Sequence, residues 1–111
     1  MKHALLFAAC LTAGPASAEF LSGNNLLELL RSQERHERAA ADGYIMGVHD
    51  TARGVVHCSP NTVTLSQVRD LSAQFITAAA ASRHKSADSL VLAILQEAFP
   101  CPKRQSRGGD V

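Results

Sequence analysis

The fold of this chain is decided by the segment Gly43-Tyr44-Ile45-Met46-Gly47-Val48-His49-Asp50, residues 43–50. In and around it, small and apolar residues recur at spacings of three or four, at Ala40, Ala41, Tyr44, Ile45, Val48 and Ala52. This period is typical of an amphipathic helix and not of a strand. We therefore predict a helix over about residues 37–53, which Gly54 ends.

Gly43 and Gly47 lie one turn apart on this predicted helix. A glycine inside a helix costs about 1 kcal/mol relative to alanine, so a pair of them requires a compensating contact. We predict that the helix is central in the fold and that a neighbouring backbone or bulky side chain packs directly against its glycine face.

Residues 1–18 have the pattern of a secretory signal peptide, with basic residues, an apolar run and then Ala16-Ser17-Ala18 as an A-x-A cleavage site. We predict cleavage after Ala18 and localisation in the periplasm or outside the cell. The alternative is a lipoprotein modified at Cys10, but the apolar run before Cys10 is short for that purpose. No later stretch reaches the ~18 apolar residues of a membrane-spanning helix, so we expect no membrane partner after cleavage.

Two cysteines remain after this cleavage, Cys58 and Cys101, and each lies near a proline that a helix cannot run through. An even number of cysteines in an oxidising compartment predicts one disulfide, with two free thiols as the alternative. The bridge would close a loop of roughly 44 residues, for which the chain-entropy argument gives at most ~4 kcal/mol of stabilisation. A domain as small as residues 19–102 gains much from such a covalent link.

Three further helices are predicted from capping residues and apolar periodicity. The first starts at Ser22 or Asn24, the next starts with the capping box Thr64-Leu65-Ser66-Gln67, and the last starts at Ser86. Their predicted buried positions are Leu26, Leu27, Leu29 and Leu30, then Leu65, Val68, Leu71, Phe75 and Ala79, and finally Leu90, Val91, Ile94, Leu95 and Ala98.

The fold class that follows is all-α, a single compact domain of about four helices over residues 19–102, in which one disulfide clamps the third and fourth helices together. Residues 103–111 have no apolar periodicity and are predicted to be a disordered tail. Loss of Lys2 with the signal peptide leaves ten basic and ten acidic side chains. This balance, with no tryptophan and one tyrosine, argues against a nucleic-acid partner.

The histidines offer the only candidates for chemistry. His49, Asp50, His57 and Cys58 are metal-ligand types close together in sequence, but their spacing matches no zinc signature. Ser59 also lies near them, without the surroundings of a catalytic serine. We predict no enzyme, no cofactor and no metal site.

Two residues of the central segment have ordinary structural interpretations. Asp50, one turn before the helix end, is expected to pair with Arg53 or with a loop amide instead of serving in acid or base catalysis. Tyr44 is expected in the core, with its hydroxyl group satisfied, and not as a functional phenol.

Several fragments occur in a characteristic order: Ser22-Gly23-Asn24 with Leu26-Leu27, the glycine segment up to Asp50, Cys58-x-Pro60 with Val63-Thr64-x-x-Gln67, His84 with Ala87 and Leu90-Val91, and Ala98-Phe99-Pro100-Cys101. This succession resembles the Rap/Tai family of type VI secretion immunity proteins over about residues 20–101. The resemblance implies a small, all-helical periplasmic protein that binds a peptidoglycan amidase effector as a homodimer and covers the enzyme's active site. The resemblance also implies that Gly43, Tyr44, Gly47 and Asp50 are structural motif residues.

The sequence departs from that family at one point. Many members carry a second cysteine pair, and the matching positions here are Leu30 and Ala41. Two apolar residues can fill the space of a lost bridge, so we expect the fold to survive with a less firmly held first helix.

The basic segment between the last two predicted helices is our candidate for the partner contact. It contains Arg83, His84 and Lys85, and its composition predicts exposure. The alternative is an ordinary solvated connection, with His84 serving a helix cap. The alternative for the protein as a whole is a small periplasmic stress chaperone, which would expose apolar surface when its carboxylates protonate.

Overall fold

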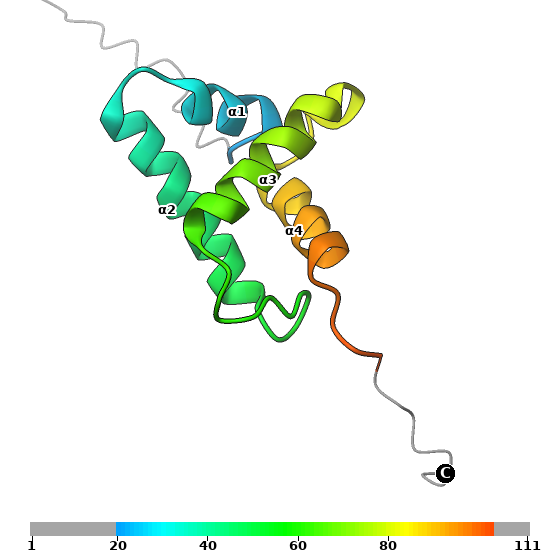
Figure 1. The fold of residues 1–111 in the computed structure, drawn as a ribbon. Coiled ribbons are helices and arrows are strands. Elements are labelled where there is room, and N and C mark those ends of the chain that lie inside the picture. The colour runs from blue at the N-terminus through cyan, green and yellow to red at the C-terminus, as the bar shows by residue number, and fades with distance from the viewer. Residues whose placement is uncertain (1–19, 104–111) are drawn as a thin grey trace, which may run out of the picture.

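Four α-helices form the part of the chain that the computed structural model describes, residues 20–103 (Figure 1). They are α1 (Gly23–Arg31), α2 (Arg35–Ala52), α3 (Leu65–Ala78) and α4 (Ala87–Ala98), with a short 3₁₀ helix, η1 (Ala80–Ser82), between α3 and α4. The all-α prediction is confirmed. The predicted signal peptide and residues 104–111 of the predicted tail lie outside the described residues.

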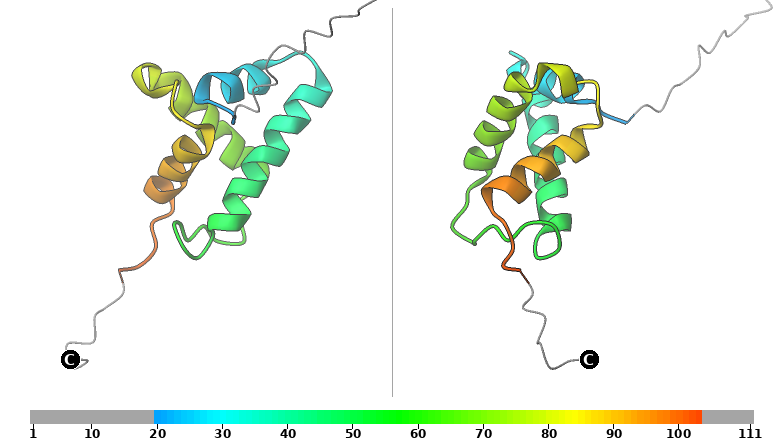
Figure 2. Two further views of the ribbon diagram at one scale, coloured as in Figure 1. Left: turned by 180° about the vertical axis from the view of Figure 1, so that it is seen from behind. Right: turned by 90° about the vertical axis from the view of Figure 1, so that its right-hand side faces the viewer.

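Each of the four helices contacts the other three. Helix α1 lies across one end of the bundle, while the connection between α2 and α3 lies at the opposite end (Figure 2). Over residues 20–103 no helix is long and apolar enough to cross a membrane.

Side-chain caps fix where α1 and α3 begin. The Ser22 hydroxyl accepts from the Asn25 amide at 3.2 Å, and the Asn25 side chain accepts from the Ser22 amide at 3.2 Å. Thr64 and Gln67 make the same reciprocal pair before α3, at 3.2 and 2.8 Å, as predicted. Ser86 precedes α4, but its hydroxyl contacts Ser89 instead of capping an amide.

The core lies where the four helices meet. Its buried side chains are Leu26, Leu27, Ala41, Ile45, Val68, Ile76, Ala87, Leu90, Val91, Ile94 and Leu95. Ala41 is fully buried and Leu30 packs against this cluster, so the two positions at which the resemblance implies a lost cysteine pair belong to the apolar core. Ala98, predicted to be buried, is exposed.

The buried face of α3 is rotated from the predicted one. Val68, Ser72 and Ile76 are its buried residues, whereas Leu71 and Phe75, predicted in the centre of the stripe, lie at its partly exposed edge. A serine can occupy the core because its hydroxyl donates to the Val68 carbonyl at 2.7 Å and is thereby satisfied.

An ion pair joins α2 to α3. Arg69 Nε and Nη2 donate to the two carboxylate oxygens of Asp42 at 2.6 and 2.7 Å, which is the bidentate geometry of a strong pair. The hydrogen bonds to Asp42 raise the pKa of Arg69 above its ordinary value. Arg69 lies outside the predicted buried stripe of this helix, whose apolar pattern does not predict the link to α2.

Candidate functional site

The predicted partner contact lies in the turn between η1 and α4, and its main chain is bonded to the start of α1. The Gly23 amide donates to the Lys85 carbonyl at 2.9 Å, and the Asn24 amide donates to the Arg83 carbonyl at 2.8 Å. A helix cannot satisfy its first amides internally, so this turn completes the capping of α1. The side chains of His84 and Lys85 are exposed, and that of Arg83 is half-buried.

Gly23 is the glycine at which the chain approaches most closely. A Cβ atom there would lie 2.4 Å from Leu90 Cδ1 and 2.9 Å from the Arg83 carbonyl oxygen, closer than real Cβ atoms come. No close approach was predicted at Gly23. Its position was a usable signal, because Gly23 directly follows the cap residue Ser22, where glycine has no particular advantage.

The predicted close approach at Gly43 and Gly47 is wrong. No atom lies within 4 Å of a Cβ atom built at either position, and both glycines are exposed. They form one wall of an open groove of about 490 Å³ between α2 and α4, and the other lining residues are Tyr44, Val48, Thr51, Ala52, Asp88 and Leu92. Within the described chain, no packing contact compensates for the cost of these two helical glycines.

Tyr44 stands at the border between this groove and the core. It is partly buried and packs against the core cluster, so its predicted core position is confirmed only in part. Burial raises the pKa of the Tyr44 hydroxyl above its ordinary value, and the nearby Asp88 carboxylate raises it further. The main chain of Asp88 acts in the opposite direction, as a hydrogen-bond donor to the phenolate.

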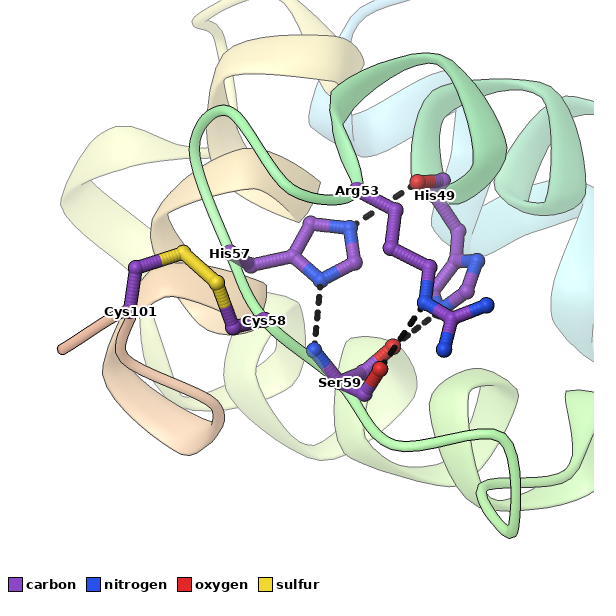
Figure 3. The surroundings of a disulfide bond; sticks show 6 residues. All are labelled: His49, Arg53, His57, Cys58, Ser59 and Cys101. Carbon is purple, nitrogen blue, oxygen red and sulfur yellow. Dashed lines mark hydrogen bonds between the residues drawn. A yellow bond between two sulfur atoms is a disulfide. The ribbon is translucent and has the colours of Figure 1, made fainter.

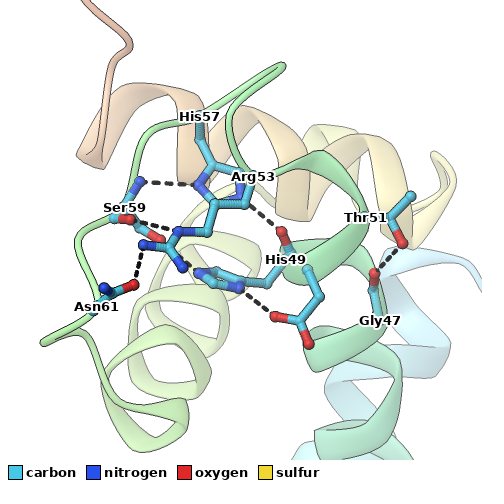
Figure 4. A network of polar contacts seen from close by, with 8 residues as sticks. Gly47, His49, Thr51, Arg53, His57, Ser59 and Asn61 are labelled. Atoms are coloured by element: carbon cyan, nitrogen blue, oxygen red, sulfur yellow. Dashed lines mark hydrogen bonds and ion pairs between the residues drawn. The ribbon is translucent and has the colours of Figure 1, made fainter.

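Asp50 pairs with its neighbour His49 and not with Arg53 or a loop amide. His49 Nδ1 lies 2.9 Å from Asp50 Oδ1, and His49 Nε2 lies 2.6 Å from Ser59 Oγ (Figure 4). The carboxylate can only accept, so Nδ1 carries the proton and Nε2 accepts from the serine hydroxyl. Arg53 instead donates to the Ser59 carbonyl at 2.9 Å and to the side chain of Asn61.

The side chains of Asp50, His49 and Ser59 are linked in the same order as the acid, the base and the nucleophile of a serine hydrolase triad. Ser59 is only 2% exposed, however, and the small pocket beside His49 and Asp50 is not lined by it. A nucleophile must be reached by its substrate, so this geometry serves the fold. Within residues 20–103 there is no cluster of three potential metal ligands either.

His57 is the fully buried centre of the same network (Figure 3). Its Nε2 lies 2.9 Å from the His49 carbonyl, and its Nδ1 accepts from the Ser59 amide at 3.3 Å. These partners identify the neutral Nε2–H tautomer. The network therefore fixes the connection between α2 and α3 onto the last turn of α2, where Gly54, with φ of +81°, ends the helix as predicted.

The predicted disulfide between Cys58 and Cys101 is present. It joins the connection before α3 to the segment after α4, and the Cys58 amide donates to the Phe99 carbonyl at 2.8 Å beside it. The bridge thus fixes the end of α4 to the same connection that the histidine network holds onto α2 (Figure 3).

Comparison with known proteins gives one family. A search among curated proteins finds no match. The sequence profile of the Rap1a immunity proteins matches residues 22–101, which is most of the chain and spans all four helices. The described chain is all-helical, as the resemblance to this family implies, and its disulfide is the one predicted from the cysteine count. The chain belongs to the family of Rap1a immunity proteins.

Proposed function

We propose that this chain is a periplasmic immunity protein that binds a peptidoglycan amidase effector of a type VI secretion system and blocks its active site. The observation that carries the proposal is the family match over residues 22–101. A protein with this role needs a rigid surface and no chemistry of its own. The buried Ser59 and the lack of a ligand cluster in the described chain are compatible with that requirement.

The turn with Arg83, His84 and Lys85 is the surface we propose for occlusion of the enzyme. Its main chain is fixed by two hydrogen bonds to α1, so the turn loses little conformational freedom when a partner binds. Its cations can steer a partner with acidic groups and contribute to specificity. Two such proteins acting together as a homodimer would present this surface twice.

Periplasmic localisation is part of the proposal. Residues 1–18 have the pattern of a signal peptide, and the disulfide is of a kind that persists in oxidising compartments. Inhibition of an injected cell-wall enzyme requires that inhibitor and enzyme share a compartment.

The test is a pull-down from periplasmic and secreted proteins of the host, with the expressed full chain as bait and identification of bound proteins by mass. We expect one peptidoglycan hydrolase, whose activity the protein inhibits. The double variant Arg83→Ala, Lys85→Ala should bind it more weakly with an unchanged melting temperature, because the hydrogen bonds of both residues to α1 come from their main-chain carbonyl groups. Unchanged affinity would remove the turn from the mechanism. Recovery of many unrelated proteins at acid pH would support a chaperone instead.

A further inference from the structure

The face of α3 that was predicted to be buried is only partly covered in the fold. Leu71 and Phe75 lie one turn apart at the surface of the bundle, while the neighbouring face of the helix places Ser72 in the core. A leucine and a phenylalanine that stay partly in water forgo the free energy that full burial would supply. Such a mismatch between sequence and fold is typical of a surface that has another role.

Two adjoining pockets of about 410 and 310 Å³ lie beside these two side chains and share Leu71 and Gln74 in their walls. We call the two pockets together the α3–α4 groove, because their residues come from α3, the last two turns of α4 and the segments next to these helices. The apolar residues that line the groove are Val63, Leu71, Phe75, Ile94, Ala98 and Phe99. The groove lies at the end of α4, whereas the turn with Arg83 precedes the start of that helix (Figure 1).

Both charged residues that line the α3–α4 groove are acidic. Glu97 lines one pocket and Asp70 lines the other, and both side chains are exposed. Neither carboxylate belongs to an ion pair within residues 20–103, and Arg69, the neighbour of Asp70, is engaged by Asp42 on the side of α2. The rim of this apolar groove therefore carries negative charge that the described chain does not neutralise.

The end of α4 adds to this negative potential. Its last turn contains Glu97 and no basic residue. The C-terminal end of a helix carries a partial negative charge, so a cation is favourable there and a carboxylate is not. A cation bound at the rim of the groove would relieve this unfavourable interaction.

We propose that the α3–α4 groove is the docking site for a basic amphipathic helix of a partner protein. The apolar side chains of that helix enter the groove beside Leu71 and Phe75, and its lysine or arginine side chains face Asp70 and Glu97. Charge disfavours a second copy of the chain, because pairing of groove with groove across a two-fold axis would bring two acidic rims together. The inference goes beyond the proposed function and does not depend on it.

Two fluorescent model peptides of about 14 residues, some four helical turns, test the proposal by anisotropy with the full chain. Both carry leucines at spacings of three and four, and the remaining positions are lysine in one peptide and glutamate in the other. The lysine peptide should bind, and the glutamate peptide should bind at least about tenfold more weakly. Asp70→Asn combined with Glu97→Gln should weaken binding of the lysine peptide by about tenfold, since two exposed ion pairs are lost.

The matched control is Glu28→Gln combined with Asp88→Asn. It removes two exposed carboxylates elsewhere, one of them from the groove at Gly43 and Gly47, and should leave binding of the lysine peptide unchanged. Gln74→Lys adds a cation to the wall that both pockets share, so it should weaken binding of the lysine peptide and strengthen binding of the glutamate peptide. Neither groove variant should lower the melting temperature, since the side chains that it changes are exposed.

Selective binding of the lysine peptide that both groove variants weaken, and that the control does not, supports the proposal. Equal binding of the two peptides, binding that survives in both groove variants, or no binding of either peptide overturns it. Two other occupants of the groove would also be detected, and either result overturns the partner helix. A peptide that dissociates a dimer of the full chain in sedimentation assigns the groove to a second copy, and a gain in affinity on Arg104→Gln with Arg107→Gln assigns it to residues 104–111.

Discussion

The glycines of this chain give a set of stability predictions with opposite signs. Gly43 and Gly47 are exposed inside α2, have ordinary helical backbone angles, and have no atom within 4 Å of a built Cβ atom. Replacing each with alanine removes about 1 kcal/mol of helix-propensity cost without a clash. Each gain comes from the backbone preference of its own residue, so the two together should reach about 2 kcal/mol.

Gly23 should respond in the opposite way. Its Cβ atom would meet the end of the flexible Leu90 side chain, which can move, and the Arg83 carbonyl oxygen, which cannot move without losing its bond to the Asn24 amide. Overpacking of this kind costs about 1–3 kcal/mol. Gly54→Ala should also destabilise, by roughly 1–2 kcal/mol, because its φ of +81° is unfavourable for any residue with a side chain.

Thermal unfolding followed by circular dichroism at 222 nm, with the disulfide intact, measures all four effects. In a domain of this size 1 kcal/mol corresponds to about 4–8 °C, so the variant with both Gly43→Ala and Gly47→Ala should melt about 8–16 °C higher than the wild type. Gly23→Ala should melt lower by at least about 4 °C. A lower melting temperature for Gly43→Ala or Gly47→Ala, with a native spectrum, would refute the reasoning and restore the close approach that the sequence suggested.

Two further predictions concern the single tyrosine and the single disulfide. Ultraviolet titration of Tyr44, which no other tyrosine obscures, should give a pKa above the ordinary value of about 10, and Asp88→Asn should lower it by removing the carboxylate charge. The folded state thus binds the phenol proton more tightly than the unfolded state does. The protonated Tyr44 therefore contributes its full stabilisation below about pH 10, and this stabilisation is lost as the pH rises through the pKa of the folded state. A titration curve identical to that of the urea-unfolded chain would contradict this prediction. Cys101→Ser should lower the free energy of unfolding by up to about 4 kcal/mol in denaturant titrations while the helical spectrum is retained, and an unchanged midpoint would show that the bridge adds no stability.

Local signals in the sequence were sufficient for the helices. The Thr64 capping box, the proline after Phe99 and the glycine at position 54 each act on their own neighbours, so their effects could be read without knowledge of the fold. The disulfide followed from the two cysteines that lie outside the predicted signal peptide, which leave one pairing.

Contacts between distant segments could not be derived in the same way. The buried face of α3 differs from the predicted one because Ser72, whose hydroxyl group is hydrogen-bonded within the helix, lies in the core. The pairing of Arg69 with Asp42 depends on how α2 and α3 cross. Gly43 and Gly47 cost helix stability, but the close approach occurs at Gly23, because a sequence shows that a glycine costs free energy and not which atoms lie beside it. For the same reason, the composition of residues 83–85 predicted an exposed turn but could not predict the main-chain hydrogen bonds that join this turn to α1.

That attachment has a consequence for how the protein can evolve. The turn is held through the carbonyl groups of Arg83 and Lys85, which every amino acid possesses, and the steric demand of the junction falls on Gly23. The exposed side chains of His84 and Lys85 can therefore be exchanged with little effect on the scaffold, whereas any side chain at position 23 meets Leu90 and the Arg83 carbonyl oxygen. For the partner contact proposed at this turn, such a scaffold would let the exposed side chains diverge quickly, since each new combination is tried on a chain that still folds.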